Sequence, residues 1–333
     1  MPTLNAALVA TPEMIDYVYG AGRRDEIARR TNLFPDFVSP AQLLEAPDCL
    51  HDVDVIFSTW SMPALESRHL DLMPRLKAVF YAAGSVQYFA RPLLLRGITV
   101  VSGWRANAIP VAEFTLAQII LATKGYFRNV AAYDGGRETQ RSAFRGAGAY
   151  GETVALLGAG AIGTHVVELL KPFQVKVIVF DPFLTHERAA QMGVEKVETL
   201  AEAFDRGYVV SNHLANNPKT VRLISREVLE RLRPNATFIN TGRGATVDEV
   251  ALADILERRK DVTALLDVTD PEPPGADSRL AKLPNVHLST HIAGGINDEV
   301  HRLADYCIAE LDRMIAGQPL QHAVTLEALE RLA

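Results

Sequence analysis

Short apolar runs alternate with amphipathic stretches along most of the chain, and this alternation predicts parallel strands covered by helices. In the first hundred residues the strand-like runs are 4–9, 53–57, 76–81 and 98–101. The stretches with helical spacing between them are 13–31, 63–70 and 86–95. None of the turns in this part has the glycine pattern of a dinucleotide site, so we expect no nucleotide there.

The alternation resumes after a long helical stretch at 107–127, which we interpret as a bridge into a second half. Pro110 lies near the expected start of this helix, where a missing N–H is tolerated. Residues 134–150 contain several Gly and Arg, which is typical of an exposed arm or loop. The later strand-like runs are 153–157, 175–180, 207–211, 237–240, 262–267 and 286–289. A final helical pattern at 297–315 follows them, and it is a candidate to pack back onto the first half.

The stretch from 153 to 181 carries the most specific motif of the chain. An apolar strand runs into Gly158, Gly160 and Gly163, and a helical run and a second strand follow. In a dinucleotide fold these glycines permit a tight turn, close approach of a pyrophosphate and close packing of the helix on the strand. The free N–H groups of such a helix point at the phosphates. The alternative is a glycine turn without a ligand, which the order strand, glycines, helix and strand disfavours.

The second strand ends at Asp181, whose carboxylate is placed to accept hydrogen bonds from the adenosine ribose hydroxyls. Asp181 is also a candidate helix N-cap, because Pro182 follows it. The two roles are compatible. The sequence Asp181-Pro182-Phe183 offers no arginine to receive a 2′-phosphate, so we expect NADH to be preferred over NADPH.

Length and charge limit the possible partners. At 333 residues the chain suits two domains, and 22% charged residues are ordinary for a globular protein. The net charge of −6 gives no electrostatic footprint for nucleic acid or for an anionic membrane, so neither is an expected partner.

The cysteines, the first residues and the most apolar stretch bear on the cellular compartment of the protein and on whether it binds a metal. Cys49 and Cys307 are far apart and have no metal-ligand spacing, so we expect a reducing cytoplasm and no metal site. The first ten residues lack the pattern of a signal peptide. The most apolar helical stretch, 111–122, is interrupted by polar side chains, and we expect it not to span a bilayer.

Three loops that follow strands of the second half carry side chains suited to one reaction. Arg243 lies between two glycines, Glu272 lies in a proline-rich turn, and His291 lies at the end of the last strand. Hydride transfer to a 2-keto acid needs a fixed cation, and a planar guanidinium grips a carboxylate with two hydrogen bonds. The developing alkoxide needs a proton, which histidine exchanges near neutral pH, and an imidazolium needs a carboxylate to orient it.

Each of these residues also has an ordinary interpretation. Arg243 alone is compatible with a surface charge, His291 with a hydrogen-bonded residue at a strand end, and Glu272 with a solvated acid. All three follow strands at the edge where such sheets bind ligands, so catalysis is the favoured interpretation.

On these motifs the chain resembles the D-isomer-specific 2-hydroxyacid dehydrogenases, which include phosphoglycerate, glycerate and lactate dehydrogenases. The resemblance covers nearly the whole chain. It implies an α/β fold of two doubly wound domains, namely a Rossmann dinucleotide-binding domain and a flavodoxin-like substrate domain. The implied NAD-binding domain is 106–297, and the implied substrate domain is discontinuous, 1–105 plus 298–333. It further implies a homodimer built around 107–150.

The resemblance also assigns roles. It implies Arg243 as the clamp for the substrate carboxylate, His291 as acid/base and Glu272 as its partner, with Asp267 facing the nicotinamide carboxamide. The implied substrate-binding residues are Ala83, Gly84, Ser85 and Arg243. The implied cofactor-binding residues are Gly158, Gly160, Ala161, Ile162, Gly163, Asp181, Leu214, Thr241, Gly242, Arg243, Asp267, His291 and Gly294.

Three segments depart from the family pattern. The substrate loop, usually a Gly-x-Gly run followed by Asp, reads Tyr-Ala-Ala-Gly-Ser-Val at 81–86. The segment usually written His-x-Pro-Leu-Thr reads His-Leu-Ala-Asn-Asn at 213–217. Thr290 stands where a proline commonly precedes the histidine.

The sequence therefore predicts an NAD-dependent oxidoreductase that interconverts a small 2-keto acid and a D-2-hydroxy acid. A formate-type dehydrogenase of the same fold is a weaker alternative, because formate oxidation needs no proton-donating His–Glu pair. An NAD(H)-sensing binding protein or corepressor is the alternative from another class, because it can retain the same three residues.

Overall fold

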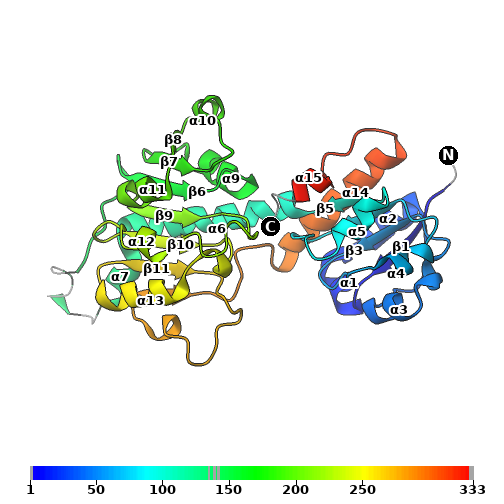
Figure 1. The fold of residues 1–333 in the computed structure, drawn as a ribbon, viewed down its shortest axis with the longest axis horizontal. Helices are drawn as coiled ribbons and strands as arrows, with labels where there is room; N and C mark the ends of the chain where they lie inside the picture. Colours follow the sequence, from blue (N-terminus) through cyan, green and yellow to red (C-terminus); the bar gives the residue numbers. More distant parts are fainter. Residues whose placement is uncertain (1–2, 134–135, 138–139, 141–142, 330–333) are drawn as a thin grey trace. The chain divides into compact units, whose positions relative to one another are not determined.

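The computed structural model describes residues 3–133, 136–137, 140 and 143–329 (Figure 1). The chain divides into two compact units. The first unit comprises Met1–Asn107 and Gly295–Ala333, and the second unit comprises Ala108–Gly294. The chain thus leaves the first unit after Asn107 and returns to it at Gly295. The side-chain Oδ1 of Asn107 accepts a hydrogen bond from the Gly295 N–H (2.9 Å), which ties the departing and returning segments together.

The first unit is built on a sheet with the order β2-β1-β3-β4-β5-β13. All neighbours are parallel except β13, which runs antiparallel to β5. The order of the first five strands is that of flavodoxin-like folds, which confirms the predicted class. The strands are β1 Asn5–Val9, β2 Asn32–Leu33, β3 Val55–Ser58, β4 Ala78–Tyr81, β5 Thr99–Ser102 and β13 Ala323–Val324.

Helices cover both faces of this sheet, so each face has its own apolar core. The helices are α1 Pro12–Tyr19, α2 Arg23–Arg30, α3 Pro40–Glu45, α4 Ser67–Asp71, α5 Ala90–Leu95, α14 His301–Ile315 and α15 Leu326–Leu329. The 3₁₀ helices are η1 Pro47–Leu50 and η4 Asn297–Val300. The apolar side of α14, which includes Leu303, Cys307 and Leu311, packs in one core with Ile15 and Val18 of α1.

The expected single helix at 13–31 is wrong, because the chain forms α1 and α2 with a break between them. At the break, Ala21 (φ +49°) and Gly22 (φ +84°) adopt the left-handed conformation, which cannot continue a right-handed helix. A Cβ on Gly20 would also lie 2.4 Å from the Asp16 carbonyl oxygen. The apolar periodicity runs through this break because both helices pack on the same sheet.

The second unit contains seven parallel strands in the order β12-β11-β10-β9-β6-β7-β8. From β8 to β11 this is the 3-2-1-4-5-6 order of a Rossmann fold, with β12 added at one edge, which confirms the predicted class. The short strand β8 was not predicted, because two of its three residues are charged. The strands are β6 Thr153–Leu157, β7 Lys176–Phe180, β8 Glu195–Val197, β9 Val209–Asn212, β10 Thr237–Asn240, β11 Thr263–Leu266 and β12 Val286–Leu288.

Helices again pack on both faces, and aromatic residues such as Phe204 and Phe238 are fully buried in one of the two cores. The helices are α6 Trp104–Lys124, α7 Tyr126–Ala131, α9 Ala161–Leu170, α10 His186–Met192, α11 Leu200–Arg206, α12 Arg226–Leu229 and α13 Glu249–Arg258. The 3₁₀ helices are η2 Gly244–Thr246 and η3 Leu280–Lys282.

Helix α6 differs from the expectation at both ends. It begins at Trp104, so Pro110 lies inside the helix rather than near its start. It ends at Lys124, where Gly125 (φ +72°) separates it from α7. By length and mean hydropathy (1.3) its segment Trp104–Thr123 passes a test for a membrane span, which we did not expect. Half of that segment is buried in the structure, as is typical of a core helix, and Ile119 packs in a core with β6.

The register of the second sheet aligns the carboxyl ends of its central strands. Leu157 pairs with Asn212, Asn212 with Asn240, Asn240 with Leu266, and Leu266 with Leu288. The residues that follow these five strand ends therefore start along one edge of the sheet. Ligands bind at this edge in open parallel sheets, so the register positions the candidate site.

The first unit offers a test of how its last strand is held. Glu310 on α14 is 1% exposed, and its Oε2 accepts hydrogen bonds from the N–H groups of Gln321 (2.8 Å) and His322 (3.0 Å), just before β13. Glu310→Ala leaves both donors without their acceptor, and we expect the free energy of unfolding to fall by about 2–4 kcal/mol. Urea denaturation measures this.

The matched control is Asp312→Ala on the same helix, which removes an exposed ion pair with Arg30. We expect that change to cost less than about 1 kcal/mol. Equal losses in the two variants would contradict the tethering role of Glu310.

Candidate active site

The glycine loop after β6 has the geometry that each glycine was predicted to provide. Gly158 has φ +101°, and a Cβ there would lie 2.9 Å from the His213 carbonyl oxygen. A Cβ on Gly163 would lie 2.0 Å from the Gly158 carbonyl oxygen, so helix α9 approaches the strand closely. Gly160 precedes α9 with no side-chain cap, and a Cβ there would meet nothing within 4 Å. Helix α9 begins at Ala161 and Ile162, and the open space beside Gly160 leaves room for an anion near the helix N-terminus.

Asp181 links the end of β7 to this loop. Its Oδ2 accepts a hydrogen bond from the Ala159 N–H (2.7 Å), and its Oδ1 accepts one from the Phe183 N–H (2.7 Å). The predicted N-cap role is wrong, because α10 begins at His186 and the Thr185 side chain caps it. The half-buried carboxylate keeps further lone pairs beside the glycine loop.

Two buried asparagines at neighbouring strand ends fix the loop that carries Arg243. Asn212 Nδ2 donates to Asn240 Oδ1 (2.9 Å) and to Thr246 Oγ1 (2.9 Å). Asn240 Oδ1 also accepts from the Gly242 N–H (3.1 Å), and Asn240 Nδ2 donates to the Arg243 carbonyl oxygen (3.2 Å). No role was predicted for these asparagines from the sequence. Their signal was an asparagine at the end of each of two buried strands.

Arg243 is a partly buried cation at this edge. Its Nη1 donates a hydrogen bond to the Gly242 carbonyl oxygen (2.8 Å). Burial lowers the pKa of Arg243 from its ordinary value, and the negative charge of Glu272 raises it. The guanidinium remains charged at neutral pH, and Glu272 is close enough to act on it electrostatically.

His291 and Glu272 form a direct pair. His291 Nδ1 lies 2.5 Å from Glu272 Oε1. The carboxylate accepts the Nδ1 proton, so Nε2 is the nitrogen left to exchange a proton with another molecule. The side chains are 47% and 38% exposed, so the pair is open to solvent or to a ligand. His291 has φ +57°, an uncommon conformation for a residue other than glycine.

A buried carboxylate holds the loop of His291 in place. Asp267 is 2% exposed, and its Oδ1 accepts hydrogen bonds from Ser289 Oγ (2.6 Å) and the Ile292 N–H (2.9 Å). Its Oδ2 accepts one from the Ala293 N–H (2.9 Å), and its own carbonyl accepts the His291 N–H (3.0 Å). These donors all belong to the loop of His291. Asp267 therefore restrains the left-handed backbone of the histidine.

His213 is buried and neutral. Its Nε2 lies 3.0 Å from Ser211 Oγ, and its Nδ1 lies 3.4 Å from Thr241 Oγ1, which also contacts Thr115 Oγ1 (3.1 Å). Burial lowers the pKa of His213 to about 3. A histidine that is neutral at this pH is a packed hydrogen-bonding side chain rather than a proton donor. The next residue, Leu214, packs in the core, and its N–H donates to Asn212 Oδ1 (3.2 Å).

The predicted substrate loop lies in the first unit, directly after β4, whereas the other candidate residues lie in the second unit. The single O–H of Ser102 is shared between the carbonyl oxygens of Gly84 (2.7 Å) and Ala83 (3.2 Å). Within the described part of the chain, no acceptor lies within hydrogen-bonding distance of the N–H groups of Gly84 and Ser85. These two amides are available to an anionic ligand.

The remaining predictions concern Gly294 and metals. Gly294 is the last residue of the second unit, next to the Gly295 amide that binds Asn107. Over the described ranges of the chain, no group of three or more His, Cys, Asp or Glu side chains is placed to hold a metal ion.

Comparison with known proteins identifies the family. The model described as "D-isomer specific 2-hydroxyacid dehydrogenase, NAD binding domain" matches residues 116–293, which is more than half of the chain and lies within the second unit. The chain belongs to this family. The second unit is accordingly its NAD-binding domain. The D-3-phosphoglycerate dehydrogenase of Methanocaldococcus jannaschii is 34% identical over 232 residues, covering 69% of this chain and 44% of that protein.

The chain thus spans about half the length of the curated relatives it matches. Solved structures share the fold at lower identity. A phosphoglycerate oxidoreductase from Rhizobium etli has a TM-score of 0.80 at 22% identity, covering 98% of this chain and 99% of that one. D-mandelate dehydrogenase from Rhodotorula graminis has a TM-score of 0.79 at 21% identity, covering 97% and 98% respectively.

The buried Asp267 yields a test of loop geometry. Asp267→Asn replaces one acceptor oxygen by an NH₂ group that faces a backbone or hydroxyl donor. We expect a loss of about 1–3 kcal/mol in unfolding free energy, because a buried donor loses its partner. Ser289→Ala is the control, since it leaves both backbone donors in place, and we expect it to cost about 1 kcal/mol or less. Thermal denaturation compares the two, and an Asp267→Asn variant as stable as wild type would refute this account.

Proposed function

We propose that this chain catalyses hydride transfer between NAD(H) and a short, unphosphorylated 2-keto or D-2-hydroxy acid. The observation that carries the proposal is the His291–Glu272 contact of 2.5 Å near the partly buried Arg243, at the carboxyl edge of an NAD-binding sheet. An acid/base pair and a fixed cation at one edge are what reduction of a keto acid requires.

The three side chains divide the chemistry among them. NADH, when bound, supplies the hydride for the carbonyl carbon. The Arg243 guanidinium binds the substrate carboxylate and stabilises negative charge on the carbonyl oxygen. The electron pair of the C=O bond moves to that oxygen, which takes the proton from His291 Nε2. Glu272 keeps the Nδ1 proton in place and so fixes the tautomer that His291 adopts after the transfer.

The residues around the glycine loop fit a dinucleotide. We assign the pyrophosphate to the amides of Gly160, Ala161 and Ile162, where a Cβ at Gly160 would meet nothing. We assign the adenosine ribose to Asp181, whose charge would repel a 2′-phosphate. The other proposed cofactor contacts are Gly158, Gly163, Leu214, Thr241, Gly242, Arg243, Asp267, His291 and Gly294.

The substrate class follows from the loop after β4. The free amides of Gly84 and Ser85 suit a carboxylate, and the side chains of Ala83 and Ser85 are small and uncharged. Such a loop has no cation for a phosphate. We therefore propose a short keto acid without a phosphate, although the matching curated relatives are named for phosphoglycerate.

We also propose that the chain forms a homodimer through the α6–α7 region. Large apolar side chains are exposed there: Leu121, Tyr126, Val130 and Tyr133. A second copy of the chain would remove them from water. Light scattering of the purified protein measures the mass in solution.

The proposed activity and cofactor predict the outcome of a substrate screen. We expect NADH oxidation with one or more of glyoxylate, hydroxypyruvate, pyruvate, 2-ketobutyrate and phenylpyruvate, and a much lower kcat/KM with phosphohydroxypyruvate. A phosphate facing Asp181 would cost about 2–4 kcal/mol, so NADPH should be a poor cofactor. The decrease in absorbance of the reduced cofactor measures the preference among keto acids and the preference between NADH and NADPH. Tight NADH binding without turnover of any keto acid would favour the corepressor alternative, and formate oxidation would favour the formate-type one.

The proposed clamp predicts how Arg243 variants behave. Arg243→Lys keeps the charge but loses the bidentate hydrogen bonding to the carboxylate, so we expect kcat/KM for the keto acid to fall at least about tenfold. The dissociation constant of NADH should change little, and titration of NADH fluorescence measures it. Near wild-type kcat/KM in Arg243→Ala would show that another group binds the carboxylate.

The proposed proton donor predicts a larger loss at His291. We expect His291→Ala to lower kcat by roughly 10²–10⁴-fold, the range of a positioned acid/base. Glu272→Gln retains a possible hydrogen bond to Nδ1 and should lose less. Steady-state reduction assays rank the two variants, and the reverse ranking would argue that Glu272 itself carries the proton.

A further inference from the structure

Glu249 contacts the loop that carries Glu272. Asp248 caps α13 by accepting the Ala251 N–H (3.0 Å), which makes Glu249 the first residue of the helix. Glu249 Oε1 then accepts a hydrogen bond from the Asp270 N–H (2.9 Å). Burial raises the pKa of Glu249 to about 7, and the neighbouring charge of Asp270 adds to the shift. The Asp270 N–H lies two residues before Glu272 in the chain.

The same stretch of backbone is held from a second side by the Arg243 loop. A Cβ on Gly244 would lie 2.1 Å from the Thr269 carbonyl carbon and 2.6 Å from the Asp270 nitrogen. The absence of a side chain at Gly244 therefore lets the peptide between Thr269 and Asp270 pack against the residue next to Arg243. Glu249 binds the N–H of that same peptide.

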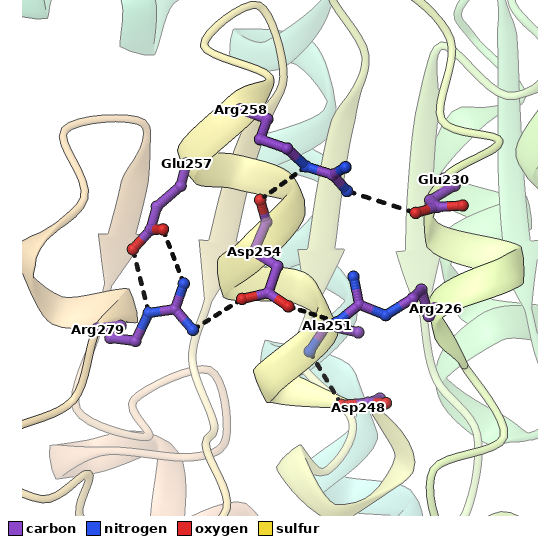
Figure 2. A network of polar contacts seen from close by, with 8 residues as sticks. All are labelled: Arg226, Glu230, Asp248, Ala251, Asp254, Glu257, Arg258 and Arg279. Atoms are coloured by element: carbon purple, nitrogen blue, oxygen red, sulfur yellow. Dashed lines mark hydrogen bonds and ion pairs between the residues drawn. The ribbon is translucent and has the colours of Figure 1, made fainter.

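The far end of the Glu272 loop is also attached to α13, but at the surface. Figure 2 shows Arg279 reaching Glu257 and Asp254, with Asp254 also contacting Arg226. Arg279 Nη2 lies 2.7 Å from Glu257 Oε2, and Arg279 Nη1 lies 2.8 Å from Asp254 Oδ1. These ion pairs are exposed to solvent, so each contributes little. The half-buried contact at Glu249 is the anchor nearer to Glu272.

We infer that Glu249 is a positioning residue, which holds the peptide between Thr269 and Asp270 against Gly244 and thereby sets the place of Glu272 relative to Arg243 and His291. The inference rests on the proposed function, since it acts through Glu272. It assigns Glu249 no contact with substrate or cofactor. A misplacement of a catalytic group by about 1 Å costs up to two orders of magnitude in rate, so a single backbone anchor can matter.

Protonation links this anchor to pH. An ionised carboxylate accepts an N–H more strongly than a neutral carboxyl group. Asp270 is the charged group that acts on Glu249 from the facing loop. As the pH falls through about 7, Glu249 takes up a proton and its hold on the Asp270 N–H weakens. The amide of a glutamine at this position would accept the same N–H at any pH.

A double-mutant cycle tests the inference. We expect Glu249→Ala to lower kcat roughly tenfold with little change in the NADH dissociation constant, and Glu249→Gln to restore most of the rate. In a Glu272→Gln background, Glu249→Ala should cause little additional loss, because its effect passes through Glu272. The control is Glu257→Ala on the same helix, which breaks a surface pair with Arg279 and should leave kcat unchanged.

The outcomes separate this inference from the proposed function. If Glu272→Gln alone reduces keto acids at the wild-type rate, the proposed role of Glu272 is wrong. If Glu272→Gln is impaired but Glu249→Ala keeps the wild-type kcat, or lowers kcat by the same factor in both backgrounds, the inference is overturned and the proposed function stands. Circular dichroism reports whether Glu249→Ala folds.

A second measurement does not depend on the alanine variant. The ratio of kcat in wild type to kcat in Glu249→Gln should fall as the pH is lowered from 8 to 6, because only the wild-type anchor titrates. A ratio that stays constant over this range would overturn the inference that protonation of Glu249 weakens its hold on the Asp270 N–H. The Glu257→Ala variant, assayed in parallel, should follow the wild-type profile.

Discussion

The in-register parallel pairing of β6, β9, β10, β11 and β12 is the constraint on which the second unit depends. Parallel neighbours without a slip bring strand ends from widely separated parts of the sequence to one edge. Gly158 follows β6, Asp267 follows β11, and the loop of His291 follows β12. A shift of one residue in any pair would turn every side chain of that strand to the other face and move its loop along the edge.

Polar groups at this edge fall into two classes by exposure. Asp267, Asn212 and Asn240 are buried, and their hydrogen-bonding groups are paired with loop backbone and neighbouring side chains. Because they are buried and paired in this way, these residues fix the conformation of the loops and are poor candidates for exchanging protons. His291 and Glu272 are about half exposed, so a ligand can reach them. The division separates the groups that set geometry from those suited to chemistry.

The two units also differ in what they offer a ligand. The second unit supplies charged and titratable side chains on a backbone restrained by buried carboxylate and amide groups. The loop after β4 in the first unit supplies backbone amides and small side chains, held through their carbonyls by Ser102.

Much of this could be predicted from the sequence, because the signals are local. Gly158, Gly160 and Gly163 between an apolar strand and a helix predicted the nucleotide loop, since the turn, the open approach and the close packing each require the absence of a side chain. Alternating periodicity predicted both sheets, and the residues after strand ends predicted Arg243, Glu272 and His291. Breaks such as Gly20–Gly22 and Gly125 were missed, because apolar spacing continues across a helix break when both helices pack on one sheet.

Only the tertiary structure decided which groups meet. Asp181 was a candidate helix cap by sequence, but its oxygens bind Ala159 and Phe183, because the glycine loop folds back over the end of β7. Asp267 was expected to face the nicotinamide and Glu249 had no predicted role, but the fold brings the His291 loop against Asp267 and the Asp270 amide against Glu249. Their roles depend on hydrogen bonds across about 20 residues or more of sequence, and no local pattern encodes such a distance. The sequence by itself determined most strands of the two sheets and which candidate residues follow them, because these signals are local, while the three-dimensional packing determined which backbone each carboxylate restrains.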